Sequence, residues 1–318
     1  MTDLRRADLH VHSCHSKVCG TLKFLGSRDC YSAPHEVYRV AKARGMDYVA
    51  LTDHDSIDGA LELLASHPDL DDVIVGEEVS CWLPDTGIQV HFGVYGISER
   101  LHRELQPLRR NAFDVAARLR EAGVFFALNH LLHFYRGQIP LESYLRLLDC
   151  VPALEVRNGT MLPAHNALIE RMVARSPATT RLAMVAGSDA HTLRRVGRTW
   201  TSAPGNTREA FLSSLAQGLG RPGGMHGGAP AVAGDVYGVV GSYVAALAGL
   251  GPRDLRGWRR AGCLAFATVS LPGQLVFPIA VAMAGKSRER REVRRALAYL
   301  EGSSRGTERT SMHKESEA

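Results

Sequence analysis

Two histidines separated by a single residue, His10 and His12, stand near the start of the chain. Side chains on an extended strand alternate between its two faces, so both imidazoles would point to the same side. At strand spacing they would lie about 6 to 7 Å apart, within reach of one metal ion. Such a pair is weak evidence alone, because a buried or surface position explains it equally well.

Further residues with metal-ligating side chains follow later apolar runs. They are His54 in Thr-Asp-His-Asp, Glu78 in Gly-Glu-Glu, His91, His130 in Leu-Asn-His, Glu155 and Asn158 around one run, and Asp189 and His191 in Gly-Ser-Asp-Ala-His. Imidazoles and carboxylates together suit manganese, zinc or iron. A carboxylate such as Glu78, or alternatively its neighbour Glu77, can bridge two ions that activate a water and bind phosphoryl oxygens. The sequence therefore predicts a site for two divalent metal ions.

The elements that would position these residues are short apolar runs alternating with helical patterns up to residue 217. The expected strands are 7–12, 48–51, 73–75, 89–95, 124–128, 153–156 and 182–186, and the expected helices are 34–44, 57–66, 99–122, 141–148, 164–174 and 207–215. This alternation is typical of βα units with a mostly parallel sheet. The candidate ligands stand at or near the strand ends where βα barrels collect their active sites.

A different pattern begins after the barrel region 1–217. Residues 218–228 are rich in glycine and proline and predict a linker, 229–302 predict a helical, apolar extension, and 303–318 predict a disordered tail. Within the extension, 261–284 are 24 residues without a charge, long enough to cross a bilayer, yet Pro272 and Pro278 interrupt them. A membrane-associated segment, with surface contact through 256–291, and a buried helical pair both remain open.

The charge of the chain is unevenly distributed over its 318 residues. Residues 1–225 hold 25 basic and 25 acidic side chains, whereas 226–318 hold 13 against 8, so the excess of +5 lies in the last third. A neutral barrel offers no basic groove for a long nucleic acid duplex. Six scattered cysteines without a Cys-x-x-Cys pair, and an N-terminus without a signal-peptide core, predict a cytoplasmic protein, associated with a membrane if the extension is.

These motifs, in this order, resemble the polymerase and histidinol phosphatase (PHP) superfamily of metal-dependent phosphoesterases over roughly residues 5–220. The resemblance implies an α/β fold, a distorted seven-stranded βα barrel of TIM-like type, and hydrolysis of a phosphoester by a metal-bound hydroxide. The ligands implied are His10, His12, Glu78 and Asp189 for one ion, Glu78, His91 and His130 for a second, and His54 and His191 for a third.

The resemblance leaves the third ion incomplete. Small phosphoesterases of the family commonly carry an aspartate five residues after the second histidine, where this chain has Lys17, so His15, Cys19 or Asp29 would have to substitute. The catalytic residues implied are His54, His191 and Asp189, with His54 or His191 binding phosphate or protonating the leaving oxygen. Candidate phosphate-binding arginines near the last two strand ends are Arg157, Arg194, Arg195 and Arg198.

The substrate expected from the resemblance is a small phosphoester, with a nucleotide or short oligonucleotide first and an amino-acid-pathway phosphate second. Two other interpretations remain open. One is a non-catalytic metal-binding regulatory module tethered at a membrane, and the other is a phosphoesterase acting on a lipid-linked substrate.

Overall fold

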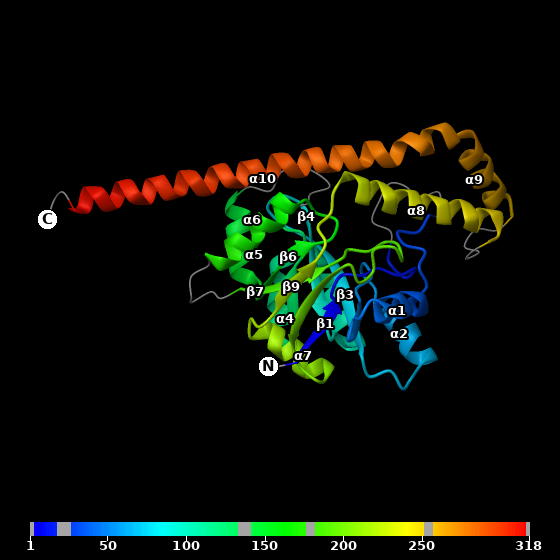
Figure 1. Cartoon of the computed structure of the whole chain (residues 1–318), viewed down its shortest axis with the longest axis horizontal. Helices are drawn as coiled ribbons and strands as arrows, with labels where there is room; N and C mark the ends of the chain where they lie inside the picture. The colour runs from blue at the N-terminus through cyan, green and yellow to red at the C-terminus, as the bar shows by residue number, and fades with distance from the viewer. Residues whose placement is uncertain (1–2, 18–26, 133–140, 176–181, 251–256, 316–318) are drawn as a thin grey trace.

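The structure, a computed structural model, describes residues 3–17, 27–132, 141–175, 182–250 and 257–315. In these residues one sheet curves into a nearly closed barrel (Figure 1). Its order is β7-β6-β5-β4-β3-β2-β1-β8-β9. The strands are β1 (Leu4–Asp8), β2 (Tyr48–Leu51), β3 (Val73–Trp82), β4 (Gln89–Tyr95), β5 (Phe125–Leu128), β6 (Ala153–Asn158), β7 (Ala183–Gly187), β8 (Thr199–Pro204) and β9 (Arg221–Gly224). A bridge between Val11 and Ala190 joins the ends of β1 and β7, which confirms the predicted barrel.

Two features of the sheet differ from the sequence prediction. All seven expected strands exist, but β8 and β9 are additional, and β3, β4 and β5 pair antiparallel, so the sheet is mixed rather than mostly parallel. The reversal at β4 follows from a hairpin, because Gly87 takes a φ of +66° in the turn after β3. Glycine adopts this conformation without steric cost, so the chain returns beside β3 with no crossover helix.

Residues 218–228, expected to be a linker, contain β9, which pairs with β8. Glycine is needed here for close approach rather than flexibility. A Cβ on Gly223 would lie 2.6 Å from the indole nitrogen of Trp200, and one on Gly227 would lie 2.0 Å from the carbonyl oxygen of Thr160. The linker prediction was therefore wrong for this segment, because composition does not distinguish a flexible glycine from a closely packed one. The division of the chain into domains stays a prediction.

Helices cover the outside of the barrel close to their expected positions. They are α1 (Pro34–Ala43), α2 (Asp58–Ser66), α3 (Glu99–Leu105), α4 (Ala112–Glu121), α5 (Leu141–Cys150), α6 (Pro163–Ala174) and α7 (Arg208–Ala216). The single helix expected over 99–122 is divided by a 3-10 turn, Gln106–Arg110. Pro107 lacks a backbone N–H, and the side chain of Asn111 accepts a hydrogen bond from the N–H of Phe113, starting a new helix.

The amino-terminal end of the barrel interior is filled with apolar side chains. Tyr48, Phe125, Ala153 and Ala183 lie at or near the starts of their strands in one buried cluster. Fully buried Tyr95 joins this cluster from the antiparallel β4, which ends at the same side. Since apolar packing occupies this end, the polar residues of the strands gather at the other.

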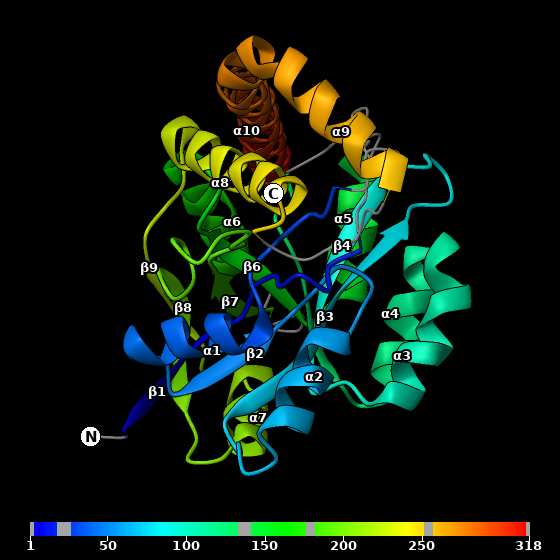
Figure 2. The ribbon, with the colours of Figure 1, turned by 90° about the vertical axis from the view of Figure 1, so that its right-hand side faces the viewer.

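The carboxyl-terminal extension consists of α8 (Ala229–Ala248), α9 (Gly257–Val269) and α10 (Leu271–Glu315), and α10 runs beside α8 across the barrel (Figures 1 and 2). Of the described helices, α8 is long and apolar enough to cross a membrane, and α9 with the first part of α10, bent by 75°, would count as a second if it were one span. Most apolar side chains of 261–284 are exposed, among them Phe266, Val269 and Leu275, so the expectation of a buried helical pair was wrong, while membrane association stays a prediction.

The tail expected to be disordered from residue 303 continues α10 as far as Glu315. The prediction rested on the scarcity of apolar residues. That criterion fails here because a helix that has already formed extends at low cost per residue, without needing a nucleus of its own.

The middle of α10 is attached to the barrel by buried polar contacts. Lys286 Nζ lies 2.5 Å from Glu289 Oε2, and Glu289 Oε1 accepts a hydrogen bond from the backbone N–H of Leu162 at 2.7 Å. Leu162 is the N-cap of α6, where a negative charge is favourable. The fully buried His165 lies beside this pair, with Nδ1 3.7 Å from Glu289 Oε1. The extension is thus packed on α6.

We expect His165→Gln to make the protein less sensitive to acid. Burial lowers the pKa of His165 to about 3, below its unfolded value, so the neutral form is favoured in the fold. The resulting stability is complete above pH 6.5 and is lost as pH falls towards 3, by about 2 kcal/mol at pH 5. Urea unfolding should show that, from pH 7.5 to pH 5, the free energy of unfolding falls by about 2 kcal/mol more in the wild type than in the variant. Equal losses in the two proteins would contradict this account.

Candidate metal centre

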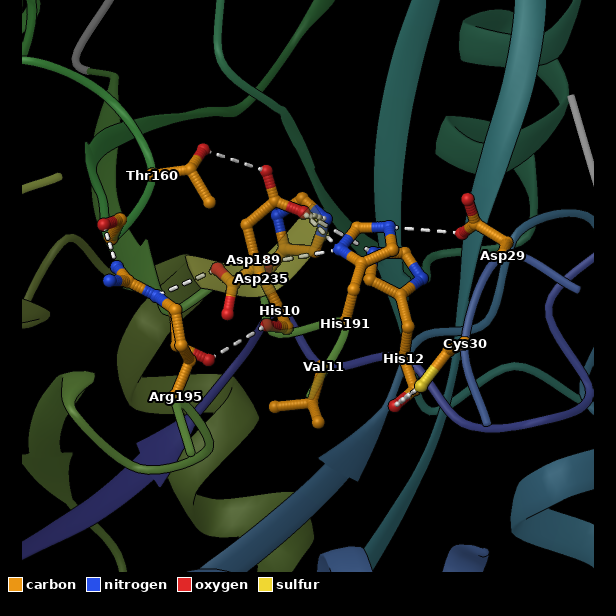
Figure 3. A network of polar contacts seen from close by, with 12 residues as sticks. His10, Val11, His12, Asp29, Cys30, Thr160, Asp189, His191, Arg195 and Asp235 are labelled. Atoms are coloured by element: carbon orange, nitrogen blue, oxygen red, sulfur yellow. Dashed lines mark hydrogen bonds and ion pairs between the residues drawn. The ribbon is translucent and has the colours of Figure 1, made fainter. Parts of the chain in front are cut away.

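The metal-ligating side chains predicted from the sequence meet at one end of the barrel. Figure 3 shows four of them, His10, His12, Asp189 and His191, together with Asp29. His10 and His12 come just after β1, which ends at Asp8 rather than at the expected residue 12. The bridge from Val11 to Ala190 still keeps this segment extended, and the two imidazole centroids are 5.1 Å apart. His54 lies past β2 and forms a bridge with Glu78 inside β3.

The carboxylate of Glu78 lies at the centre of this group and is fully buried. Its Oε2 is 3.1 Å from His10 Nε2, 3.4 Å from His12 Nε2 and 3.1 Å from His54 Nδ1, while its Oε1 is 3.2 Å from His91 Nδ1 and 3.1 Å from His130 Nε2. One carboxylate therefore faces five imidazoles from four other parts of the barrel. This arrangement fits a carboxylate that bridges metal ions.

Glu77, the alternative to Glu78, points to the other side of β3. Its Oε2 lies 2.8 Å from His102 Nδ1, and its Oε1 accepts a hydrogen bond from Gln106 on the outer helical layer. Because successive side chains of a strand face opposite ways, only one of the two glutamates can face the histidines. The structure places Glu78 there.

Asp189 and Asp29 extend the cluster towards the extension. Asp189 Oδ1 is 3.5 Å from His10 Nε2 and 3.4 Å from His12 Nε2. Asp29 Oδ2 is 2.9 Å from His191 Nε2 and 3.8 Å from His54 Nε2. The four ligating groups of His12, Asp29, His54 and His191 lie within 4.8 Å of one another. Asp29 thus lies where the remaining ligand of the third ion was expected, a position for which the sequence left His15, Cys19 and Asp29 as candidates.

The other candidates for that position lie elsewhere or outside the described residues. His15 Nε2 lies 2.8 Å from Glu62 Oε2 on the surface of α2. Lys17, which stands where the family commonly has an aspartate, donates a hydrogen bond from Nζ to the backbone carbonyl of Asp55 at 2.7 Å. Cys19 lies outside the described residues. The loop before α1 therefore supplies an aspartate, Asp29, later in the sequence than the aspartate that the family commonly carries five residues after its second histidine.

Several side chains hold the histidines in orientation. His10 Nδ1 lies 2.9 Å from Glu155 Oε1, and His12 Nδ1 lies 3.0 Å from the hydroxyl of Ser16. Asn158 donates a hydrogen bond to Glu155 Oε2 at 2.9 Å, which fixes that carboxylate in turn. Ring nitrogens held in this way leave Nε2 of both histidines pointing into the cluster. From the sequence, Glu155 and Asn158 could be recognised only as strand-end residues, and Ser16 could not be recognised because it belongs to no recurring pattern.

The donor set fits divalent metal ions. Within the described part of the chain, His10 Nε2, His12 Nε2, His54 Nδ1, Glu78 Oε2 and Asp29 Oδ2 are buried and make no hydrogen bond, although each lies 2.9 to 3.4 Å from another ligating atom of the cluster. Buried polar atoms in proteins almost always have a partner, because leaving one unpaired costs about 1 to 3 kcal/mol. Atoms of nitrogen and oxygen type that converge unpaired are the donors that manganese, zinc and iron prefer.

The electrostatics of the cluster keep its carboxylates ionised. Burial raises the pKa of Glu78, but the neighbouring His10, His54 and His91 more than offset this and hold it well below its usual range. Asp189 likewise has a pKa well below its usual range, because His10 and His12 outweigh its burial. Burial lowers the pKa of His191, and Asp29 reverses this and raises it to about 10. A metal ion would have to displace such protons from imidazoles, so its affinity should rise with pH.

Backbone strain is concentrated at this site. In the described residues, the non-glycine residues with positive φ are Asp55 (52°), His130 (29°) and Asp189 (52°). Such conformations cost roughly 1 to 3 kcal/mol each and persist where the surroundings impose them, often at functional sites. Two of these residues are candidate ligands, so the fold holds their side chains in place at the expense of local stability.

We expect Gly187→Ala to destabilise the protein and weaken metal binding. A Cβ on Gly187 would lie 2.3 Å from His10 Cβ and 2.6 Å from the His10 backbone nitrogen, so one of the two segments must shift. Overpacking of this kind costs typically about 1 to 3 kcal/mol, measurable by urea unfolding. Gly241→Ala on α8 is the control, because nothing lies within 4 Å of its added Cβ. Equal stability and metal affinity in the two variants would contradict the prediction.

The four candidate phosphate-binding arginines mainly contact backbone carbonyls and the extension. Arg195 is buried, donates to the carbonyl of Gly159 and has Nε 3.3 Å from Asp235 Oδ2 in α8. Arg157 donates to Gly224 O, and Arg198 donates to the carbonyl of Arg194. A guanidinium atom of Arg194 would lie 3.1 Å from a Cβ on Gly234 of α8. Their phosphate-binding role stays a prediction.

A cavity of about 540 Å³ opens beside the cluster. Asp29, Asp189 and His191 line one side of it. Among the described lining residues, the arginines named above are absent, and the basic side chains are Lys286 and Arg288 of α10. The most accessible side chain among the imidazoles of the cluster is that of His191, at 24% exposure. The site is thus reached from the side covered by the extension.

Comparison with known proteins agrees with this geometry. Residues 171–219 match the model of a family described as PHP-associated. An uncharacterized protein of Methanocaldococcus jannaschii is 33% identical over 75 residues, which cover 23% of this chain and 43% of that protein. A two-domain protein of Bacteroides vulgatus, containing a predicted PHP-like metal-dependent phosphoesterase, has a similar structure, with a TM-score of 0.50, 18% identity, and coverage of 71% of this chain and 66% of that one.

The chain therefore aligns with less than two thirds of the length of either relative. The family match contains β7, the Asp189 and His191 motif, and β8, while the structural likeness shows the barrel fold. The resemblance seen in the sequence is confirmed to this extent: residues 171–219 match a PHP-associated family, and the barrel has the fold of a protein that contains a predicted PHP-like phosphoesterase.

Proposed function

We propose that the protein is a hydrolase that cleaves a small phosphoester with the help of divalent metal ions held by the cluster at the barrel mouth. The observation that carries this proposal is the convergence of ligating atoms around Glu78, from segments that are far apart in the sequence. The residues that would hold the ions are His10, His12, Asp29, His54, Glu78, His91, His130, Asp189 and His191. Ions held there would neutralise charge on phosphoryl oxygens and lower the pKa of a water.

The chain's own residues divide the remaining work by position. Glu155 and Ser16 orient His10 and His12, and so keep their ligating nitrogens turned into the cluster. His191 lines the cavity and is partly exposed, so it is placed to contact a phosphate oxygen or the leaving oxygen. His54 is buried deeper, between Glu78 and Asp29, and is better placed to bind a metal ion than to meet the substrate.

The balanced reaction is ordinary hydrolysis. The oxygen of a water forms a bond to phosphorus, the bond between phosphorus and the ester oxygen breaks, and a proton is returned to the leaving oxygen. No redox partner is required.

The test is hydrolysis of an aryl phosphate and of a mononucleotide by the purified full chain with manganese or zinc. We expect turnover that is lost on chelation and restored by the metal. Asp189→Asn should also abolish turnover, because it removes a carboxylate charge shared by His10 and His12. If protein with a measured metal content hydrolysed no ester, the non-catalytic metal-binding module would replace this proposal.

A further inference from the structure

The cavity beside the cluster joins two chemically different surfaces. Its lining includes the polar side chains of Asp29 and His191 from the cluster, and the apolar side chains of Val236 and Val239 of α8 with Val281 and Ala282 of α10. Charged side chains of the extension also line it, namely Asp235, Lys286, Arg288 and Glu289. Its volume of about 540 Å³ lies within the usual range for small-molecule sites. The extension therefore forms one wall of the space through which a substrate reaches the cluster.

This wall is held in place by contacts of α8 with the last ligand loop. Asp235 is buried in an otherwise apolar helix, and its Oδ1 accepts a hydrogen bond from the hydroxyl of Thr192 at 2.8 Å. Its Oδ2 lies 3.3 Å from Arg195 Nε. A Cβ on Gly238 would lie 2.8 Å from Thr192 Cγ2, so α8 approaches the residue after His191 as closely as a glycine permits.

The other half of the wall is held to the barrel through α10. Lys286 and Glu289 form their buried ion pair one to two turns after Val281 and Ala282, and Glu289 binds the start of α6. Thr160 and Met161, which precede α6, also line the cavity, and Thr160 donates a hydrogen bond to Asp189 at 3.1 Å. Both helices of the wall are thus connected to residues around the cluster.

We propose that this cavity receives the apolar part of the substrate, and that the protein acts on phosphoesters of an alkyl alcohol. This inference rests on the proposed phosphoesterase function. The phosphoryl group would lie at the Asp29 and His191 end, while the alkyl chain would lie between the valines of α8 and α10. A nucleoside would instead bring hydroxyls and ring nitrogens against these valines, where they lose hydrogen bonds to water without replacement.

In hydrolysis the bond between phosphorus and the alkyl oxygen breaks, a water oxygen joins phosphorus, and the alcohol leaves with a proton. Two sources of such a substrate share this chemistry, a soluble alkyl phosphoester and a membrane lipid. Phe266, Val269 and Leu275, on α9 and the start of α10, are more than half exposed beyond the cavity. If the substrate is a membrane lipid, these exposed apolar side chains would contact the membrane.

Binding of alkyl phosphonates, which are not hydrolysed, tests the inference without relying on turnover. Calorimetry on the full chain, with and without manganese, would compare phosphonates of two to eight carbons with a nucleoside phosphonate. We expect binding to tighten about three- to fourfold per added methylene until the cavity is filled. Displacement by phosphatidic acid vesicles, but not by phosphatidylcholine vesicles, would identify a membrane source, and its absence would identify a soluble one.

Val239→Trp fills the cavity and should abolish this dependence on chain length, whereas Val240→Trp, on the adjacent residue outside the lining, should retain it. Should Val239→Trp fail to fold, Val239→Ser should reduce binding of the longer phosphonates several-fold. Binding independent of chain length in the wild type would overturn the inference, as would equal effects of the two tryptophan variants. If either of these results is obtained and the protein still hydrolyses esters, the inference about the alkyl chain fails but the proposed function stands. Chain-length-dependent binding without turnover of any ester would contradict the proposed function instead.

Discussion

Glu78→Gln is expected to remove metal from the purified protein and to lower phosphoester hydrolysis about a thousandfold, or roughly 4 kcal/mol of transition-state stabilisation. The glutamine keeps the size of the side chain but loses the charge that faces five imidazoles at 3.1 to 3.4 Å. Without that charge, Asp189 and Asp29 would be the remaining negatively charged ligands, and the other ligands would be neutral histidines. Elemental analysis of dialysed protein would measure the metal content, and circular dichroism would verify the fold.

Glu77→Gln is the matched control for this experiment. It makes the same chemical change one residue earlier, on the side of β3 that faces His102 and Gln106. The control should keep its metal and its activity, although it loses a buried contact and some stability. Loss of metal from Glu77→Gln with retention in Glu78→Gln would reverse the assignment of the two glutamates.

Asp29→Asn is expected to lower hydrolysis on the order of a hundredfold and to reduce the number of ions bound per chain. Asp29 Oδ2 is buried and lies 2.9 Å from His191 and 3.8 Å from His54, so it completes the cluster nearest the cavity. The remaining cluster around Glu78 does not depend on this side chain. Metal titration monitored by calorimetry should therefore lose its weakest step and keep the others.

His15→Ala provides the comparison for Asp29, because both residues were candidates for the same ligand position. His15 contacts Glu62 on the surface, so its loss should leave metal content and hydrolysis unchanged. An unchanged metal stoichiometry in Asp29→Asn, together with a reduced one in His15→Ala, would show that the loop before α1 adopts a different arrangement when metal is bound.

Much of the fold could be predicted because strand and helix periodicities are local properties. Six of the seven expected strands and most helices lie within a few residues of their expected limits, and the ligand residues stand at the strand ends or within strands. The exception is β3, which was expected to end at residue 75 and continues to Trp82, so Glu78 lies inside the strand and not after it. The errors occur where long-range contacts decide. The strand β9 depends on β8 as a partner. Gly223 within it and Gly227 after it are explained by Trp200 and Thr160, which lie far from them in the sequence.

The sequence by itself determined the chemistry of the site. His10 and Asp189 could be identified because each is followed by a histidine two residues later, on the same face of an extended segment, and residue type decides which metals they suit. Glu78 was preferred to Glu77 only through the resemblance to the PHP superfamily. Only the tertiary structure selected Asp29 among three candidates, since a loop residue has no periodicity from which its direction follows. It also brought α8 and α10 over the barrel mouth, because Asp235 and Glu289 find their partners on segments distant in sequence.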